Sequence, residues 1–87
     1  MSYEISLRRA AQKNLDALSG QDYEMVARSI SSLEQKPRPP RVKKLADSSL
    51  WRIRKGIYRI VYSIDDEAKS VIIVRVVRRQ EDTYKSL

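Results

Sequence analysis

The 87-residue chain contains no cysteine and no histidine. Without cysteine it can form no disulfide, and it has no thiol nucleophile and no thiolate metal ligand. Without histidine it lacks the commonest general base and metal ligand, so any catalysis must use lysine, arginine, tyrosine or a carboxylate. These two absences exclude cysteine-based and histidine-based active sites.

Long hydrophobic stretches are missing as well. No run approaches the roughly 20 apolar residues that a membrane-spanning helix needs. The N-terminus, residues 1–5, has neither the basic stretch nor the long apolar core of a signal peptide. Since the lack of cysteine also suits a reducing compartment, we expect a cytoplasmic protein with no membrane partner.

Positive charge predominates in what is present. The chain has 18 Lys and Arg against 11 Asp and Glu, a net charge of +7, and its pI is about 10.0. In so short a chain this balance predicts a polyanionic partner, either nucleic acid or an acidic protein. The alternative is a basic surface that is merely solvated. The length and the 41% of hydrophobic residues predict one small domain, residues 1–87, with a single modest core.

Two periodicities divide the first half of the chain. Apolar residues alternate over residues 3–7, which predicts a half-buried strand. From Arg9 the period becomes helical, and Gly20 is placed to end this first helix. A second helix is expected over residues 21–35, where the proline-rich stretch 37–40 stops it. Its apolar stripe consists of Tyr23, Val26, Ile30 and Leu33.

Three strand-like runs follow a basic connector, residues 41–49, for which the sequence predicts no secondary structure. The runs cover residues 50–54, 57–64 and 71–78, and the gaps between them have hairpin length. The order is a strand, two helices in a hairpin, and three strands. It predicts an α+β fold in which a three-stranded antiparallel meander joins the first strand in a four-stranded sheet, with both helices on one face.

The segment LWRIRKGIYRIVYSI, residues 50–64, alternates cations with large apolar side chains. A two-residue turn at Lys55-Gly56 would place Arg52 directly opposite Arg59. One face of this hairpin would be apolar and would pack on the helices, while the other would carry Arg52, Arg54 and Arg59. Because directly opposed like charges are destabilising, we interpret this second face as a binding site for an anion. An ordinary solvated face is the alternative.

The third run ends in Arg78-Arg79, and Tyr84 follows five residues later. This tyrosine could stack on a nucleic-acid base. It could equally pack against the edge of the sheet.

Taken in order, these segments resemble the RelE/ParE superfamily of toxin–antitoxin toxins, and the RelE-type mRNA interferases most closely. The resemblance covers nearly the whole chain. It rests on the first strand and helical hairpin, Val-Lys-Lys-Leu at 42–45, Trp-Arg-Ile-Arg at 51–54, Tyr-Arg-Ile-Val-Tyr at 58–62, the acidic turn at 65–67 and Arg-Arg…Tyr at 78–84. It implies the toxin of a type II toxin–antitoxin system with a cognate antitoxin as partner. The charge of +7 predicts an acidic, amphipathic binding segment in that antitoxin.

The resemblance also implies a reaction. RelE-type toxins cut mRNA in the ribosomal A site without a metal or other cofactor, by attack of a 2′-hydroxyl on the adjacent phosphate. Ribosome and mRNA are therefore expected partners. The family's catalytic positions fall here on Arg52, Arg54, Arg59, Arg79 and Tyr84. RNA or ribosome binding is expected of Lys43, Lys44, Lys55 and Arg78, and Arg78 is also the alternative to Arg79.

Some family members have lysines at the positions of Arg52 and Arg54. Guanidinium groups stabilise charge on a phosphate well, but arginine stays protonated and cannot act as a base. The general base is therefore open among Tyr84, Lys43, Lys44, Lys55 and a group of the ribosome.

Two other functions fit the same residues. A ParE-like protein of the same fold would inhibit DNA gyrase by binding it and would need no catalytic set. A basic RNA-binding module without catalysis would use the same arginines and aromatic residues.

Overall fold

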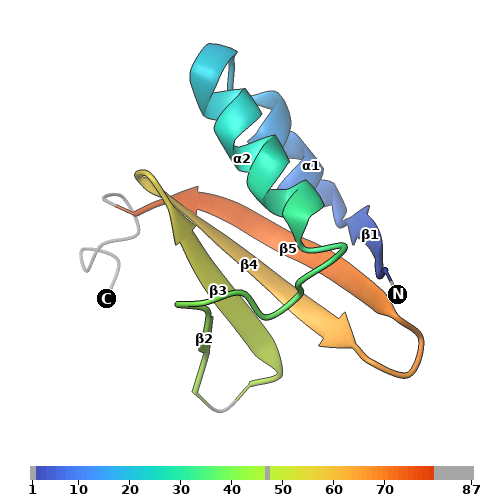
Figure 1. Ribbon diagram of the computed structural model, residues 1–87. Helices are drawn as coiled ribbons and strands as arrows, with labels where there is room; N and C mark the ends of the chain where they lie inside the picture. Colours follow the sequence, from blue (N-terminus) through green and yellow to red (C-terminus); the bar gives the residue numbers. More distant parts are fainter. Residues whose placement is uncertain (1, 47, 80–87) are drawn as a thin grey trace.

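The computed structural model describes residues 2–46 and 48–79, which form two helices and five strands (Figure 1). The elements are β1 Glu4–Leu7, α1 Arg9–Asp16, α2 Gly20–Ser32, β2 Lys43–Lys44, β3 Leu50–Lys55, β4 Tyr58–Asp65 and β5 Ser70–Arg78. The predicted α+β class and the order of its elements are confirmed. The sheet has one strand more than predicted, because two residues of the unassigned connector form β2.

The five strands form one mixed sheet in the order β1-β5-β4-β3-β2. β1 lies parallel to β5, and all other neighbours are antiparallel. The near-continuous apolar sequence of β5 is explained by its position between β1 and β4. The strand β2, only two residues long, is too short to show the alternation by which a strand is predicted.

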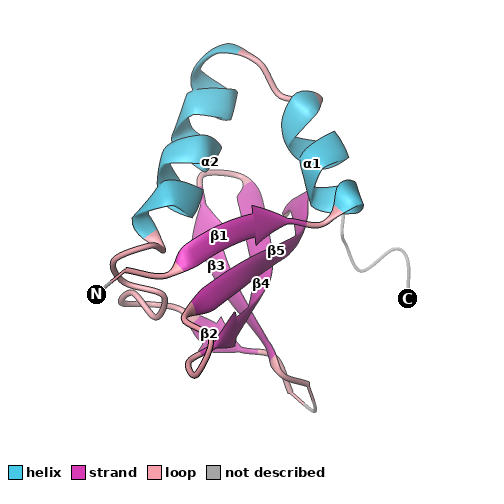
Figure 2. Ribbon diagram, turned by 90° about the vertical axis from the view of Figure 1, so that its right-hand side faces the viewer, coloured by secondary structure: helices cyan, strands magenta, loops and turns pink. Residues whose placement is uncertain are grey.

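Both helices lie on one face of the sheet, side by side (Figures 1 and 2). The core between them consists of Ala11, Leu15, Val26, Ile30, Leu33, Tyr58, Ile60, Tyr62, Val71, Ile73 and Val76. Three members of the predicted apolar stripe, Val26 and Ile30 on α2 and Leu33 just after it, are therefore buried, but Tyr23 is 42% exposed and lies outside the core. No helix in the described part of the chain is both long and apolar enough to cross a membrane.

The β3–β4 hairpin turns one residue later than predicted. Lys55 pairs with Tyr58, so the turn residues are Gly56 and Ile57, and Gly56 has the positive φ of 60° that favours glycine at the start of such a turn. Arg59 therefore lies opposite Arg54, not opposite Arg52 as predicted. Moving the turn by one residue shifts each pair by two residues, and side chains two residues apart on a strand lie on the same face of the sheet. The predicted division into an apolar and a cationic face is therefore retained.

A β-bulge changes the alternation in β5. Val61 pairs with Arg75, but Tyr62 pairs with Ile73, so β5 has one extra residue at Val74. Beyond the end of β1, the backbone N–H of Val76 donates a hydrogen bond to Oδ1 of Asn14 on α1, at 3.0 Å. This side chain occupies the place of a missing strand partner and joins α1 to the bulged part of β5.

Candidate functional site

Cations gather on the sheet face that points away from the helices. The strand pairing places Arg52 beside Lys43 and Val61, and it places Arg54 opposite Arg59. Because Val61 pairs in turn with Arg75, this arginine lies on the same face. We call this set, Lys43, Arg52, Arg54, Arg59 and Arg75, the arginine face.

A groove of about 480 Å³ opens at one side of the arginine face. It is lined by Arg41, Lys43, Arg52, Arg54, Gly56 and Arg79, and none of these residues is acidic. We call it the arginine groove. Five cationic side chains from the connector, β2, β3 and the end of β5 thus share one depression, and their summed charge makes it attractive to anions.

Arg79 reaches this groove because it is tied to the β3–β4 turn. Its backbone N–H donates a hydrogen bond to the carbonyl oxygen of Ile57. Its Nη1 donates a second one to the carbonyl oxygen of Gly56, at 2.9 Å. These two bonds hold Arg79 over the turn, although it follows the last residue of β5.

Arg52 lines the groove and is close enough to three other arginines to feel their charge. Partial burial, followed by the neighbouring charges of Arg54, Arg59 and Arg79, lowers the pKa of Arg52 below its ordinary value. Its Nε atom is buried and has no hydrogen-bond partner within residues 2–46 and 48–79. Burying a polar donor without a partner is costly, and crowding of like charges adds to that cost. Both costs would fall if an anion occupied the groove.

The other predicted binding residues lie elsewhere. Lys55 pairs with Tyr58, and Tyr58 pairs with Arg78, so both cations are on the side of the sheet that the helices cover. Lys44 pairs with Trp51 and lies 5.8 Å from its ring centroid, also on that side. Of the four residues assigned to RNA or ribosome binding, only Lys43 shares the arginine groove. Tyr84 lies outside the described residues.

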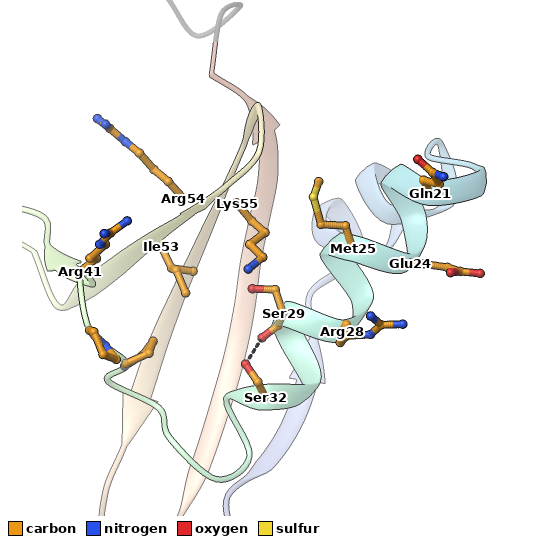
Figure 3. Close-up of a pocket in the computed structure, with 12 residues that line it drawn as sticks. Gln21, Glu24, Met25, Arg28, Ser29, Ser32, Arg41, Ile53, Arg54 and Lys55 are labelled. Carbon is orange, nitrogen blue, oxygen red and sulfur yellow. Dashed lines mark hydrogen bonds between the residues drawn. The ribbon is translucent and has the colours of Figure 1, made fainter.

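A second, larger groove of about 630 Å³ runs between α2 and β3 (Figure 3). Met25 and Ser29 border it on the helix, and Ile53 borders it on the strand. Figure 3 shows Arg54 projecting from β3 away from α2, whereas Lys55 points toward the helix. Arg41 and Arg54 line both grooves, so the two depressions meet at these side chains.

The segment that carries Arg41 is firmly attached to the rest of the fold. Buried Tyr62 donates a hydrogen bond from its hydroxyl to the carbonyl oxygen of Pro37, at 2.7 Å, and burial raises the pKa of Tyr62 to about 12. Arg38 forms a two-pronged ion pair with Asp66, at 2.9 and 3.2 Å, and lies 5.0 Å from the ring centroid of Trp51. The hydrogen bond from Arg38, and then that from the Tyr3 hydroxyl, lower the pKa of Asp66 to about 2.

Sequence reasoning missed two cations of this site. Arg41 lies in the connector, whose path the sequence does not reveal. Arg75 would share the buried side with Val71 and Ile73 if β5 alternated strictly, and only the bulge brings it to the arginine face. The one available signal was the charge of Arg75. An arginine at a position that strict alternation would bury indicates a bulge, which shifts the alternation by one residue.

Chemically, the site is an array of guanidinium and ammonium donors without acidic neighbours in the groove. Such donors bind phosphate oxygens and stabilise negative charge that builds up on phosphorus. Within the described residues no group of three Cys, His, Asp or Glu side chains is placed to hold a metal ion.

The fold and the site together define a small basic α+β domain whose cations gather on the sheet face away from the helices. A family model of the ParE toxin of type II toxin–antitoxin systems, parDE, matches residues 5–83. The chain therefore belongs to this family of toxins, within the RelE/ParE superfamily, as the sequence resemblance predicted. No curated protein sequence matches it.

Solved structures with the same fold include both branches of the superfamily. A chain of the toxin–antitoxin complex RelBE2 from Mycobacterium tuberculosis is 28% identical, with a TM-score of 0.81 over 91% of this chain and 100% of that one. One from the archaeal RelE–RelB complex of Pyrococcus horikoshii is also 28% identical, with a TM-score of 0.80 over 91% and 97%. One from the chromosomal ParDE system of Pseudomonas aeruginosa is 14% identical, with a TM-score of 0.72 over 88% and 96%, a similarity of fold alone.

Proposed function

We propose that this toxin is a ribosome-dependent endoribonuclease that cuts mRNA in the A site. The observation that carries the proposal is the arginine groove, where Arg52, Arg54 and Arg79 meet without an acidic neighbour. Binding of an acidic protein would also offset this crowding of charge, but it does not require the cations to converge on one point. A protein that binds a phosphodiester in its transition state gains most, because the charge on the phosphate is then greatest.

In the proposed reaction the 2′-oxygen of one nucleotide attacks the adjacent phosphorus. The O2′–P bond forms, the P–O5′ bond breaks, and the products are a 2′,3′-cyclic phosphate and a free 5′-hydroxyl. Arg52 and Arg54 hold the non-bridging oxygens, while Arg59 and Arg79 stabilise the charge from the neighbouring strand and turn. One proton leaves the 2′-hydroxyl, and one reaches the leaving 5′-oxygen.

The proton-transfer residue is proposed from position. Of the three candidate lysines, Lys43 lines the arginine groove, and its strand pairing puts it beside Arg52. Lys44 and Lys55 lie on the other side of the sheet, so with Arg78 they would contact the ribosome and not the reacting phosphate. Tyr84 remains the second candidate for proton transfer and could also stack on a base.

The proposed partner is an antitoxin with an acidic, amphipathic segment. Two of the chains of similar fold, each 28% identical, come from toxin–antitoxin complexes of the RelBE type, and a chain of net charge +7 suits an acidic ligand. We expect this segment to cover the arginine face or to displace the residues around Tyr84. A structure of the complex in which the antitoxin avoids both would contradict this part of the proposal.

Inhibition of DNA gyrase is the second candidate, and the match to the ParE family model favours it. It requires binding surfaces but no phosphate-stabilising set. The two candidates differ in what the loss of a single arginine does. Cleavage depends steeply on each transition-state donor, whereas a large protein interface tolerates the loss of most single contacts.

The test is primer extension on a defined mRNA in programmed bacterial ribosomes. We expect new stops within A-site codons, dependent on ribosomes and absent with Arg59→Ala. Arg9→Gln, an equal loss of charge on α1 away from both grooves, should cut like the wild type. A folded, toxic protein that gives no stops but inhibits supercoiling by purified gyrase would overturn the nuclease in favour of the second candidate.

A further inference from the structure

We propose that Arg41 binds a second RNA phosphate, outside the reacting one, and fixes the path of the strand where the two grooves meet. This inference rests on the proposed function, since it takes RNA as the ligand of the arginine groove. Arg41 is not among the positions that the family resemblance assigns. Its role follows from its backbone, its anchoring and its place between the grooves.

The backbone at Arg41 is strained. Its φ of 74° lies in the left-handed region, which a residue with a Cβ atom enters only at a cost in free energy. A glycine or asparagine would suit this position better. Such strain persists where the surrounding structure enforces it, and it is concentrated at binding and catalytic sites.

The surrounding structure does enforce it. The segment is held before Arg41 by the Tyr62 bond to Pro37 and by the ion pair of Arg38 with Asp66. The backbone N–H of Val42 donates to the carbonyl oxygen of Pro39, at 3.2 Å, which closes a turn around the strained residue. After it, β2 joins the sheet through its pairing with β3. Arg41 is thus presented on a rigid support, as a pre-organised binding residue is.

This support places a cation where other cations already are. Arg41 is exposed and shares the lining of both grooves with Arg54. Neither makes an ion pair with any carboxylate in the described part of the chain. Backbone strain and repulsion therefore act together against this arrangement in the free protein. An RNA strand, which carries one phosphate per nucleotide, offsets both when a neighbouring phosphate lies against Arg41.

The expected path of the RNA follows. A strand whose reacting phosphate lies among Arg52, Arg54 and Arg79 passes Arg41 as it leaves the arginine groove. From there it enters the groove between α2 and β3, whose polar border includes Gln21, Arg28 and Ser32 and one carboxylate, Glu24 (Figure 3). The phosphate at Arg41 could belong to the mRNA or to ribosomal RNA, since both carry the same group.

The test compares Arg41→Gly with Lys69→Gly. Both remove one exposed cation from a residue with positive φ, a conformation that suits glycine, so each variant should fold. Lys69→Gly also loses the contact of Nζ with the Tyr3 ring, 5.2 Å from its centroid, so the thermal stability of each variant is measured first. Lys69 lies in the β4–β5 turn and lines neither groove. We measure the anisotropy of a short single-stranded RNA, protected by 2′-O-methyl groups, against salt, and the rate of cleavage on programmed ribosomes against toxin concentration.

We expect Arg41→Gly to weaken RNA binding about tenfold and to reduce the slope of log affinity against log salt by about 0.7, the value of one phosphate on a single strand. On ribosomes it should raise the half-saturating toxin concentration and leave the saturated rate nearly unchanged. Arg41→Lys should restore part of the affinity, and Lys69→Gly should behave as the wild type.

An effect on ribosomes without an effect on the oligonucleotide would assign the phosphate to ribosomal RNA and still support the inference. Equal behaviour of Arg41→Gly and wild type in both measurements would overturn it. Arg59→Ala, measured in parallel, distinguishes failure of this inference from failure of the proposed function. If it abolishes cleavage while Arg41→Gly changes nothing, only this inference fails, whereas a wild type that never cuts refutes the proposed function itself.

Discussion

Arg54 and Arg59 lie directly opposite each other on β3 and β4. Such a pair of like charges is destabilising in a sheet, and the neighbouring charges also lower the pKa of Arg52. The fold keeps this cost on the face away from the helices, where a bound phosphate would offset it. Stability and activity should therefore respond in opposite directions to the loss of one of these charges.

Replacing Arg54 by glutamine tests this opposition. We expect Arg54→Gln to be more stable by about 0.5 kcal/mol or less, because Arg54 is exposed and the repulsion is partly screened by solvent. The gain should shrink at high salt, which screens the wild-type repulsion. Cleavage should fall about 100-fold, as when one transition-state donor is lost. Urea unfolding at low and high salt and ribosomal cleavage rates measure both effects. An Arg54→Gln protein that is less stable yet fully active would contradict this account.

Asp66 should make part of the stability dependent on pH. Its pKa is lowered from 3.8 to about 2 in the fold by Arg38 and Tyr3, so its contribution is complete above about pH 4 and is lost as the pH falls toward 2. Thermal unfolding of wild type and Asp66→Asn should therefore differ at neutral pH and converge on acidification. A difference in Tm that stays constant from pH 6 to about pH 2 would show that the carboxylate charge is not what holds Arg38.

Asn14 should stabilise the bulged half of β5. Asn14→Ala removes the acceptor for the N–H of Val76, and an unsatisfied buried donor costs about 1–3 kcal/mol. Asn14→Asp keeps an oxygen at the same place and should retain most of the stability. Urea denaturation of the two variants checks the prediction, which is wrong if they lose equal amounts.

Lys43 and Lys44 form a natural matched pair, because adjacent residues of β2 point to opposite faces of the sheet. We expect Lys43→Ala to reduce the saturated cleavage rate, and Lys44→Ala to weaken ribosome binding with little change in that rate. Concentration series on programmed ribosomes separate the two effects. If Lys44→Ala gives the larger loss of saturated rate, the proton-transfer role does not belong to the arginine face.

Much of the fold could be predicted from the sequence, because each long element has its own period. The strand pairing in the β3–β4 hairpin was predicted wrongly, yet its faces were right, since an error of two residues preserves the alternation. A two-residue strand such as β2 carries no period at all. The exposure of Tyr23 depends on how far α2 extends beyond the sheet, which is a property of the assembled layers.

The site was predictable where it lies on regular strands and unpredictable elsewhere. Arg52, Arg54 and Arg59 follow from alternation alone. Arg75 needs the bulge at Val74, and Arg41 needs a connector whose path is set by distant partners, Tyr62 and Asp66. The separation of Lys43 from Lys44 required the register of β2, which no local pattern encodes.

The most direct test of the central claim removes one atom of the substrate, the 2′-oxygen beside the cleaved bond. Once a cut has been mapped on programmed ribosomes, the same mRNA is prepared with a single 2′-deoxynucleotide on the 5′ side of the cleaved bond. Attack by the 2′-hydroxyl predicts that cleavage at this position disappears, while the unmodified message is cut to a 2′,3′-cyclic phosphate. Undiminished cleavage of the deoxy-substituted message would contradict the mechanism that we assign to the arginine groove.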